Sequence, residues 1–225
     1  MPLLVKICGL KTPEALDVAL ESGADLVGFV FFPPSPRNLG FDAARLLGQR
    51  VKGHAGKVAL TVDADDDTLL DVVATLKPDM LQLHGSEPPE RLMAIRARFG
   101  LPVMKALPIE TRADLSAIQR YAKSTDKLLF DARAPQDATR PGGLGKPFDW
   151  TLLKNVETEI PFMLSGGLDA GNVAEALAIT RAPAVDVSSG VERAPGEKDF
   201  DKIRAFIRAA RAAAASDTRA LVSGS

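Results

Sequence analysis

The sequence predicts a single (β/α)8 barrel of the TIM type, an α/β fold, and three observations lead to this prediction. Apolar runs of strand length alternate with segments of helical period along the chain, and we count eight such pairs. The strands are apolar on both faces, as residues 26–32 show, which is typical of buried parallel strands. The last two strands each end in serine and glycine, at residues 165–167 and 188–190.

An open, doubly wound sheet is the alternative architecture. That fold usually carries its phosphate turn, G-x-G-x-x-G, directly after the first strand. Here residues 3–8 form the first expected strand, and the Gly9-Leu10-Lys11 that follows lacks this spacing. No linker or change in composition divides the chain. We therefore expect one barrel over residues 1–213, with residues 214–225 as a polar tail that frays.

Local signals support each element in order. Thr12 and Pro13 suit the N-cap and first turn of a helix that runs to Ser22, and Gly23 ends it. The later strands are expected at 26–32, 57–62, 80–84, 103–106, 127–131, 162–165 and 184–188. The later helices are expected at 42–50, 66–76, 88–99, 112–121, 150–156, 172–180 and 199–213.

A long segment without secondary structure, residues 132–149, follows the sixth strand. Its tip is rich in glycine, Gly142-Gly143-Leu144-Gly145. Structureless segments of this length in a compact domain are usually lids or binding loops. We expect it to cover the site.

Composition narrows the classes of function. The net charge of −1 gives no sign of nucleic-acid binding. Cys8 is the only cysteine, so no internal disulfide can form, and His54 and His84 are too few for a metal site. Lys6 falls where a signal peptide would be apolar, and residues 26–32 are too short to span a bilayer. We expect a cytoplasmic protein without metal, membrane or nucleic-acid partners, as a monomer or homodimer.

The turns after the last two strands have one design. Each apolar strand gives way to small residues, which leave backbone N–H groups unobstructed, and a helix start behind them would add positive dipole. Either turn alone could be an ordinary strand-to-helix connection. As a pair on consecutive strands, they predict a cradle for a phosphate dianion, formed by Gly166, Gly167, Ser188, Ser189 and Gly190.

Two groups that can move protons stand at strand ends. Cys8 ends the first strand and Asp131 the sixth, on roughly opposite sides of a barrel mouth. Cys8 could be a small buried hydrophobe; as a base, its pKa would need modest lowering by nearby cations. Asp131 could be a carboxylate satisfied by loop N–H groups; partly buried, it could hold a proton and donate it.

Other polar residues fall at the same rim. Arg37 lies in a loop stiffened by prolines and is either a solvated surface cation or a fork for a carboxylate. His84 is expected to form hydrogen bonds beside the site, and Asp186 to cap a loop or to hold substrate hydroxyls or an amine. Asp63 and Lys105 also end strands.

These residues belong to a recognisable set of motifs. It comprises Val5-Lys6-Ile7-Cys8-Gly9-Leu10, Ser35-Pro36-Arg37, Leu81-Gln82-Leu83-His84-Gly85, Leu129-Phe130-Asp131, Leu164-Ser165-Gly166-Gly167-Leu168 and Val185-Asp186-Val187-Ser188-Ser189-Gly190-Val191-Glu192. In this order the set resembles the phosphoribosylanthranilate isomerases, over about residues 4–208. Thr61 stands where the family more often has an aromatic residue, and Leu144 where it has a small polar one.

The resemblance implies an Amadori rearrangement in tryptophan biosynthesis that needs no cofactor. It implies that Cys8 is the general base and Asp131 the general acid. Arg37 would hold the carboxylate of the anthranilate group, and Asp186, Gln82 and His84 would contact the substrate. The phosphate would lie in the paired turns.

Two alternatives stay open. A related barrel could process another phosphosugar, as the indole-forming synthase or an aminoimidazole carboxamide isomerase does, although Cys8 argues against both. A catalytically inactive sensor of a phosphorylated ligand could use the same scaffold.

Overall fold

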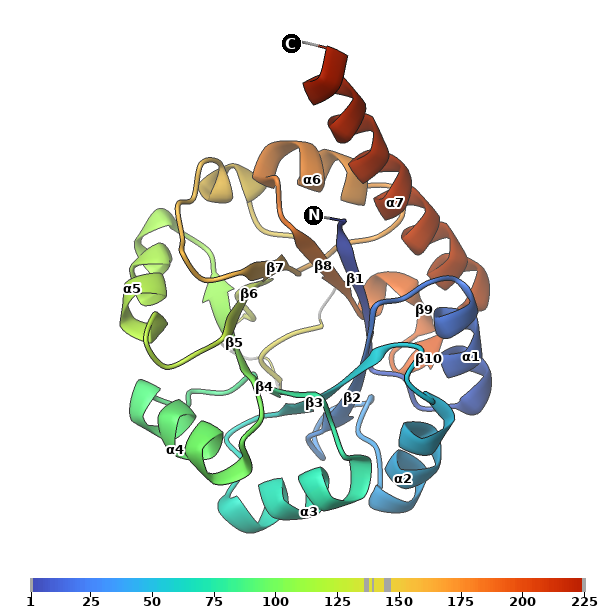
Figure 1. Ribbon diagram of the computed structural model, residues 1–225, viewed down its shortest axis with the longest axis vertical. Helices are drawn as coiled ribbons and strands as arrows, with labels where there is room; N and C mark the ends of the chain where they lie inside the picture. The colour runs from blue at the N-terminus through green and yellow to red at the C-terminus, as the bar shows by residue number, and fades with distance from the viewer. Residues whose placement is uncertain (1, 136–137, 139, 144–146, 224–225) are drawn as a thin grey trace.

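The predicted barrel is confirmed in a computed structural model of the chain, which describes residues 2–135, 138, 140–143 and 147–223. Eight parallel strands pair in sequence order, and β1 pairs with β8 to close the barrel. Figure 1 shows the strands at the centre and the helices around them. The strands are β1 (Leu4–Cys8), β2 (Leu26–Phe31), β3 (Gly56–Thr61), β4 (Met80–Leu83), β5 (Val103–Ile109), β6 (Lys127–Ala132), β7 (Phe162–Leu164) and β8 (Ala184–Val187).

The helices differ more from expectation than the strands do. They are α1 (Pro13–Glu21), α2 (Phe41–Arg50), α3 (Asp66–Leu76), α4 (Pro89–Phe99), α5 (Ala117–Tyr121), α6 (Val173–Thr180) and α7 (Phe200–Ser223). The expected helix 112–121 is a 3-10 turn, η1 (Arg112–Ser116), followed by the short α5. The expected helix 150–156 is only a 3-10 turn, η2 (Trp150–Leu153). The expected end of the last helix at Ala213 is wrong, because α7 continues to Ser223.

Caps explain why several helices begin and end where they do. The side chain of Thr12 accepts a hydrogen bond from the backbone N–H of Ala15, and Asp65 does the same for Thr68 at α3. Gly100 ends α4 with a left-handed φ of 63°. Capping therefore fixes these helix ends through contacts within a few residues of each end.

The interior of the barrel is layered. Val58, Met104 and Leu129 belong to an apolar layer toward the N-terminal ends of the strands. Cys8 and Leu60 belong to an apolar cluster toward the other end. The polar side chains between these layers are Lys6, Gln82 and Asp186, each at most 4% exposed. The apolar core outside the barrel, which includes Phe29, Phe130 and Phe206, lies between the strands and the surrounding helices.

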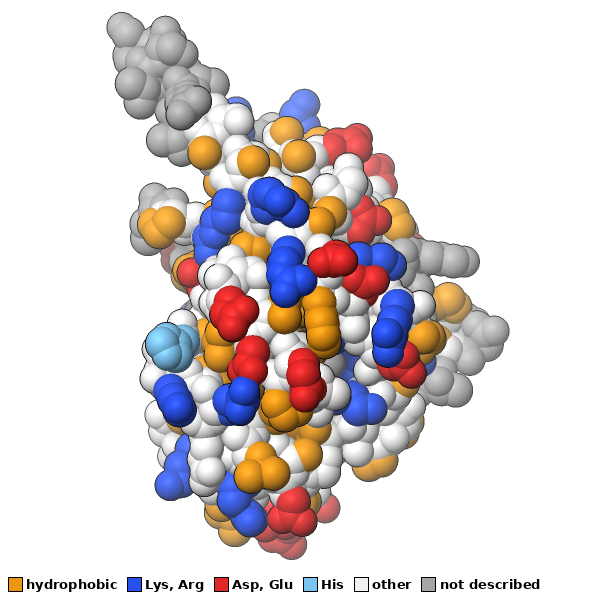
Figure 2. Space-filling view, turned by 90° about the vertical axis from the view of Figure 1, so that its right-hand side faces the viewer, with side chains coloured by type: hydrophobic (Ala, Val, Ile, Leu, Met, Phe, Trp, Pro, Cys, Tyr) orange, Lys and Arg blue, Asp and Glu red, His pale blue; other side chains and the backbone are white. Residues whose placement is uncertain are grey.

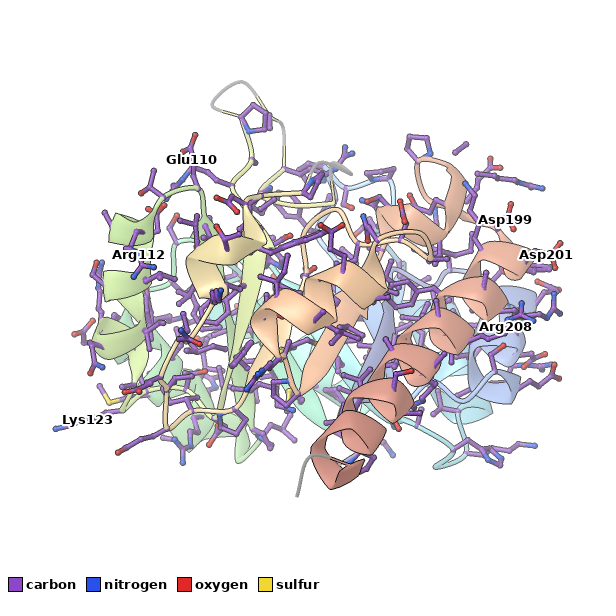
Figure 3. The ribbon with its side chains drawn as sticks, turned by 90° about the horizontal axis from the view of Figure 1, so that it is seen from above. Glu110, Arg112, Lys123, Asp199, Asp201 and Arg208 are labelled. Atoms are coloured by element: carbon purple, nitrogen blue, oxygen red, sulfur yellow. The ribbon has the colours of Figure 1, made fainter. Side chains whose placement is uncertain are left out.

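The C-terminal ends of the strands form one face of the molecule. In Figure 3, Glu110, which follows β5, lies at the upper end, and Lys123, which precedes β6, lies at the lower end. A hairpin of β9 (Glu192–Ala194) and β10 (Glu197–Lys198), which was not predicted, connects β8 to α7 on the upper side. α7 runs along the outside of the barrel, and its C-terminal turns project past the ring of helices (Figure 1).

Charges on the face seen in Figure 2 are mixed in sign. Acidic and basic side chains alternate there over the helices on the right-hand side of Figure 1. Several surface residues form ion pairs, among them Arg50 with Asp17 and Arg204 with Asp201. In the described part of the chain, no helix is long and apolar enough to cross a membrane.

Candidate active site

A cavity opens at the C-terminal ends of the strands, and it brings the two expected proton-transfer groups together. Cys8 from β1 and Asp131 from β6 both line it, with Arg37 and His84. The other lining residues are apolar side chains of β2 and β3 and their loops, part of the segment after β6, and the turns after β7 and β8. The cavity therefore offers a thiol, a carboxyl and a guanidinium to one bound molecule.

Cys8 is 3% exposed and lies against β2. A Cβ on Gly28 would lie 2.7 Å from its sulfur, so only glycine leaves room for the thiol there. Burial raises the pKa of Cys8; Lys6 and Lys198 oppose this, Asp186 adds to it, and the net direction is upward. Desolvation thus outweighs the nearby cations, and the modest lowering that would favour a thiolate at neutral pH is not found.

Asp131 is held at both carboxyl oxygens. Oδ1 accepts the backbone N–H of Ala132 at 2.9 Å, and Oδ2 lies 3.2 Å from Nε2 of His84. The segment after β6 passes directly above, since a Cβ on Gly142 would lie 2.4 Å from Oδ2. The carboxyl is thus fixed in orientation and covered by the expected lid segment.

Arg37 is buried, 4% exposed, so the reading as a surface cation is wrong. Its Nε and Nη2 donate to the two carboxylate oxygens of Glu192 at 2.8 and 2.7 Å, and Nη2 also donates to the carbonyl of Gly143. Lys198 donates to the same Glu192 at 2.9 Å. Burial works to raise the pKa of Glu192, but Arg37 and Lys198 outweigh it and hold this pKa below its usual value. The chain's own carboxylate therefore orients the guanidinium at the cavity wall.

The two serine–glycine turns lie side by side at the cavity. Gly166, Gly167, Ser188 and Ser189 line it, and Gly190 does not. A Cβ on Gly190 would lie 1.9 Å from the carbonyl oxygen of Leu168, so this glycine lets the turns pack together. The backbone N–H groups of Gly167 and Ser189 donate to no group in the described part of the chain.

The helices expected at 172–180 and 199–213 are present, but no α-helix begins directly behind either turn in the described part of the chain. α6 begins only at Val173, well past the first turn. The second turn itself contains the start of a 3-10 turn, η3 (Ser189–Val191), and α7 begins only after the hairpin. Any anion there would be bound by individual backbone N–H groups and hydroxyls rather than by a long helix dipole.

The polar layer lies beneath the cavity. Lys6 donates to Asp186 at 3.0 Å and to Gln82 at 2.7 Å, and the hydroxyl of Ser165 lies 3.4 Å from Asp186. Burial works against the charge of Lys6, but Asp186 and Cys8 outweigh it and raise its pKa. Asp186 is a strand residue paired inside the barrel and not a loop cap, although its side chain reaches the cavity. Gln82, expected to contact substrate, is fully buried and does not line the cavity.

Other expected rim residues lie elsewhere. Lys105 of β5 pairs with buried Glu87 in the loop after β4 at 2.6 Å. Asp63 accepts the backbone N–H of Ser86, which joins the loops after β3 and β4. Thr61 is fully buried and does not line the cavity, because its strand neighbours Leu60 and Val62 point there instead. Leu144 and Gly145 lie outside the described residues.

Sequence reasoning missed four residues around the cavity. Lys6 could have been found, since it precedes Cys8 by two positions and a strand directs both to one face. Glu192 and Lys198 gave no local signal, because the hairpin that positions them was not foreseen. Arg140 also lines the cavity, and its Nε is buried without a partner among the described residues.

Comparisons with known proteins identify the family to which the chain is similar. Residues 5–209 match the family model described as N-(5'phosphoribosyl)anthranilate (PRA) isomerase. The chain is 65% identical over 213 residues to N-(5'-phosphoribosyl)anthranilate isomerase of Bradyrhizobium sp. (strain ORS 278). The aligned region covers 95% of this chain and 97% of that protein.

Solved structures are similar over the whole barrel. The crystal structure of phosphoribosyl anthranilate isomerase from Thermotoga maritima superimposes with a TM-score of 0.84 at 37% identity, covering 93% of this chain and 99% of that one. A crystal structure of a phosphoribosyl anthranilate isomerase in complex with reduced 1-(o-carboxyphenylamino)-1-deoxyribulose 5-phosphate gives a TM-score of 0.79 at 34% identity. It covers 93% of this chain and 99% of that one. The chain belongs to the N-(5'-phosphoribosyl)anthranilate isomerase family.

Proposed function

We propose that this chain converts N-(5-phosphoribosyl)anthranilate to 1-(2-carboxyphenylamino)-1-deoxyribulose 5-phosphate, an Amadori rearrangement of tryptophan biosynthesis, without a cofactor. The observation that carries the proposal is the shared cavity of Cys8 and Asp131, bordered by the paired serine–glycine turns. The family's name describes this activity, and a relative has been solved with a reduced form of the product.

Asp131 acts first, as the general acid. Its carboxyl proton passes to the ring oxygen of the furanose, the bond between that oxygen and C1 breaks, and a protonated Schiff base forms. The backbone N–H of Ala132 and the ring of His84 hold the carboxyl while it gives up the proton. These two contacts stabilise the carboxylate that remains.

Cys8 acts second, as the general base. Its thiolate removes the proton from C2, the electron pair moves toward the Schiff-base nitrogen, and the resulting enolamine tautomerises to the ketone. The raised pKa keeps the thiolate scarce near neutral pH but makes it a strong base once formed. Each proton-transfer group is typically worth roughly 10²–10⁴-fold in rate.

Two anionic ends of the substrate align it between these groups. The phosphate would be bound by Gly166, Gly167, Ser188 and Ser189, with Gly190 holding the two turns together. The anthranilate carboxylate would meet the Arg37 guanidinium on the side that Glu192 leaves open. Asp186 would contact the substrate near the reacting carbons.

Growth of a tryptophan-requiring bacterial strain that lacks the isomerase tests the proposal. Expression of this chain should restore growth without tryptophan, and the Cys8→Ala variant should not. Extracts should also be assayed on the substrates of the indole-forming synthase and of the aminoimidazole carboxamide isomerase. Failure to restore growth by a well-expressed chain, or turnover of either other substrate alone, contradicts the proposal.

A further inference from the structure

A chain of hydrogen bonds crosses the barrel beneath the cavity and ends at Asp131. Nζ of Lys6 lies 2.7 Å from Oε1 of Gln82, and Nε2 of Gln82 lies 3.0 Å from Nδ1 of His84. Nε2 of His84 in turn lies 3.2 Å from Oδ2 of Asp131. The four side chains come from β1, β4, the residue after β4, and β6.

The donor at one end fixes the direction of every bond. An ammonium group can only donate, so Lys6 must face the amide oxygen of Gln82. The amide NH2 of Gln82 then faces His84, and since it too can only donate, Nδ1 of His84 must offer a lone pair. The proton of the neutral imidazole is therefore on Nε2, where it points at Asp131.

Burial prevents the amide from turning over. Lys6 and Gln82 are both fully buried, and Lys6 is also held by Asp186 at 3.0 Å. A reversed amide would place its NH2 against the ammonium of Lys6, a repulsive contact between two donors with no solvent to relieve it. The buried ion pair of Lys6 and Asp186 thus determines, through Gln82, which nitrogen of His84 carries the proton.

We propose that Lys6, Gln82 and His84 are positioning residues for Asp131, which hold His84 as a hydrogen-bond donor so that the acidic proton of Asp131 faces the cavity. With the opposite tautomer, Nε2 of His84 would carry a lone pair and could accept that proton. Asp131 would then donate to the histidine instead of to a substrate. The proposal rests on the proposed role of Asp131 as the general acid.

The tautomer can be measured without any activity. The chain has two histidines, so a His54→Gln background leaves His84 as the only histidine signal. His54 is exposed in the turn between α2 and β3, away from the cavity. Nitrogen-15 NMR of the labelled imidazole is expected to show a protonated Nε2 and an unprotonated Nδ1. If Nδ1 of His84 is protonated in the His54→Gln protein, the proposal is overturned.

The Gln82→Glu variant tests the cause. A carboxylate still accepts from Lys6 but offers His84 only acceptor oxygens, so Nδ1 should become protonated. kcat is expected to fall roughly ten- to a hundredfold with KM nearly unchanged, because Gln82 does not line the cavity. An altered tautomer with unchanged kcat, or a raised KM as the main effect, contradicts the positioning role.

Failure of this inference differs visibly from failure of the proposed function. If the unsubstituted protein does not isomerise phosphoribosylanthranilate, the proposed function fails, and the NMR result still decides the hydrogen-bond direction. If it does isomerise that substrate but His84 is protonated at Nδ1, only the inference fails. Should Gln82→Glu not fold, the spectrum of the His54→Gln protein alone decides whether His84 is held as a donor.

Discussion

At the scale of single residues, the environment of Cys8 combines two opposed effects. The apolar wall of β2 and β3 removes water from the thiol, whereas the ammonium of Lys6 lies below it and favours the thiolate. Desolvation outweighs the cation, so the resting side chain is a neutral thiol at neutral pH. Substrate that brings a positively charged Schiff base next to the sulfur would favour its ionisation.

The raised pKa of Cys8 predicts how the thiol reacts with an alkylating reagent. Because only the thiolate reacts, the rate of labelling by iodoacetamide should still be rising above about pH 8.5, where an ordinary thiol is half ionised. Mass spectrometry at a series of pH values measures the rate, and Cys8→Ala serves as the unlabelled control. A rate that levels off below pH 8 contradicts a raised pKa.

Glu192 predicts a pH-dependent contribution to stability. Its pKa is lowered on folding, so the contribution is present above the unfolded value of about 4.3 and is lost as pH falls through the folded value. Glu192→Gln leaves Arg37 and Lys198 buried with a weaker partner, and at pH 7 it should lower the free energy of unfolding by about 3 kcal/mol. Urea unfolding at pH 7 and at lower pH measures this. If the difference in free energy of unfolding between Glu192→Gln and the unsubstituted protein does not shrink in acid, the account is contradicted.

Sequence reasoning found the residues at strand ends but not the contacts beneath them. Cys8, Arg37 and Asp131 were predicted because each falls where a strand or a stiff loop ends. Glu192 was not given a role, since its contact with Arg37 spans 155 positions along the chain. The upward shift of the Cys8 pKa was also not foreseen, because the burial of a side chain cannot be judged from its neighbours in the sequence.

At the scale of elements, close contact between the turns after β7 and β8 depends on glycine. The carbonyl of Leu168 occupies the place where Gly190 would carry a side chain, and Gly166 adopts φ 85° against the backbone of β6. Both glycines permit backbone groups to approach one another, as a site made of backbone N–H groups requires.

Gly190→Ala should separate the two turns. We expect KM for the phosphorylated substrate to rise at least about tenfold, which corresponds to about 1.4 kcal/mol of binding. Gly40→Ala is the matched control, since no heavy atom lies within 4 Å of the added carbon and its backbone is extended at φ −74°. Steady-state kinetics of both variants measure the effect; equal KM values in the two variants would count against the turns as the phosphate site.

Helices were predicted less well than strands, for physical reasons. α3 was predicted with correct ends, because Asp65 and the acidic residues after it mark its start. Residues 112–121 have a helical period, but they form a 3-10 turn, capped at its start by Thr111 and Asp114, and then the short α5. α7 was predicted to end at Ala213 but continues to Ser223. Its alanine-rich segment has a high propensity to stay helical, and no glycine or proline stops the helix there.

At the scale of the whole molecule, closure of the barrel creates the site. β1 lies beside β8, with Lys6 in register with Asp186, and this pairing joins the two ends of the sequence. The register places a lysine and an aspartate inside the barrel at the same level. The sequence alone could predict eight strands and their order, but not that a buried ion pair would occupy the middle layer.

The prediction that the C-terminal tail, residues 214–225, frays can be tested by truncation. Ile203, Phe206 and Ala210 anchor α7 in the outer core, each fully buried. A chain ending at Ser216 should keep its melting temperature within about 2 °C, whereas Phe206→Ala should cost about 3 kcal/mol, roughly 6–12 °C. Calorimetry on both proteins decides, and a drop above about 5 °C in the truncated chain would show that its last turns contribute to the fold.

The central claim is that the barrel mouth holds a thiol base and a carboxyl acid on opposite sides of one substrate. Steady-state turnover of phosphoribosylanthranilate by Cys8→Ala and Asp131→Asn tests it most directly. Each variant should lose at least about a hundredfold in kcat, with a melting temperature within about 2 °C of the unsubstituted protein. Near-normal kcat in either variant would contradict the claim.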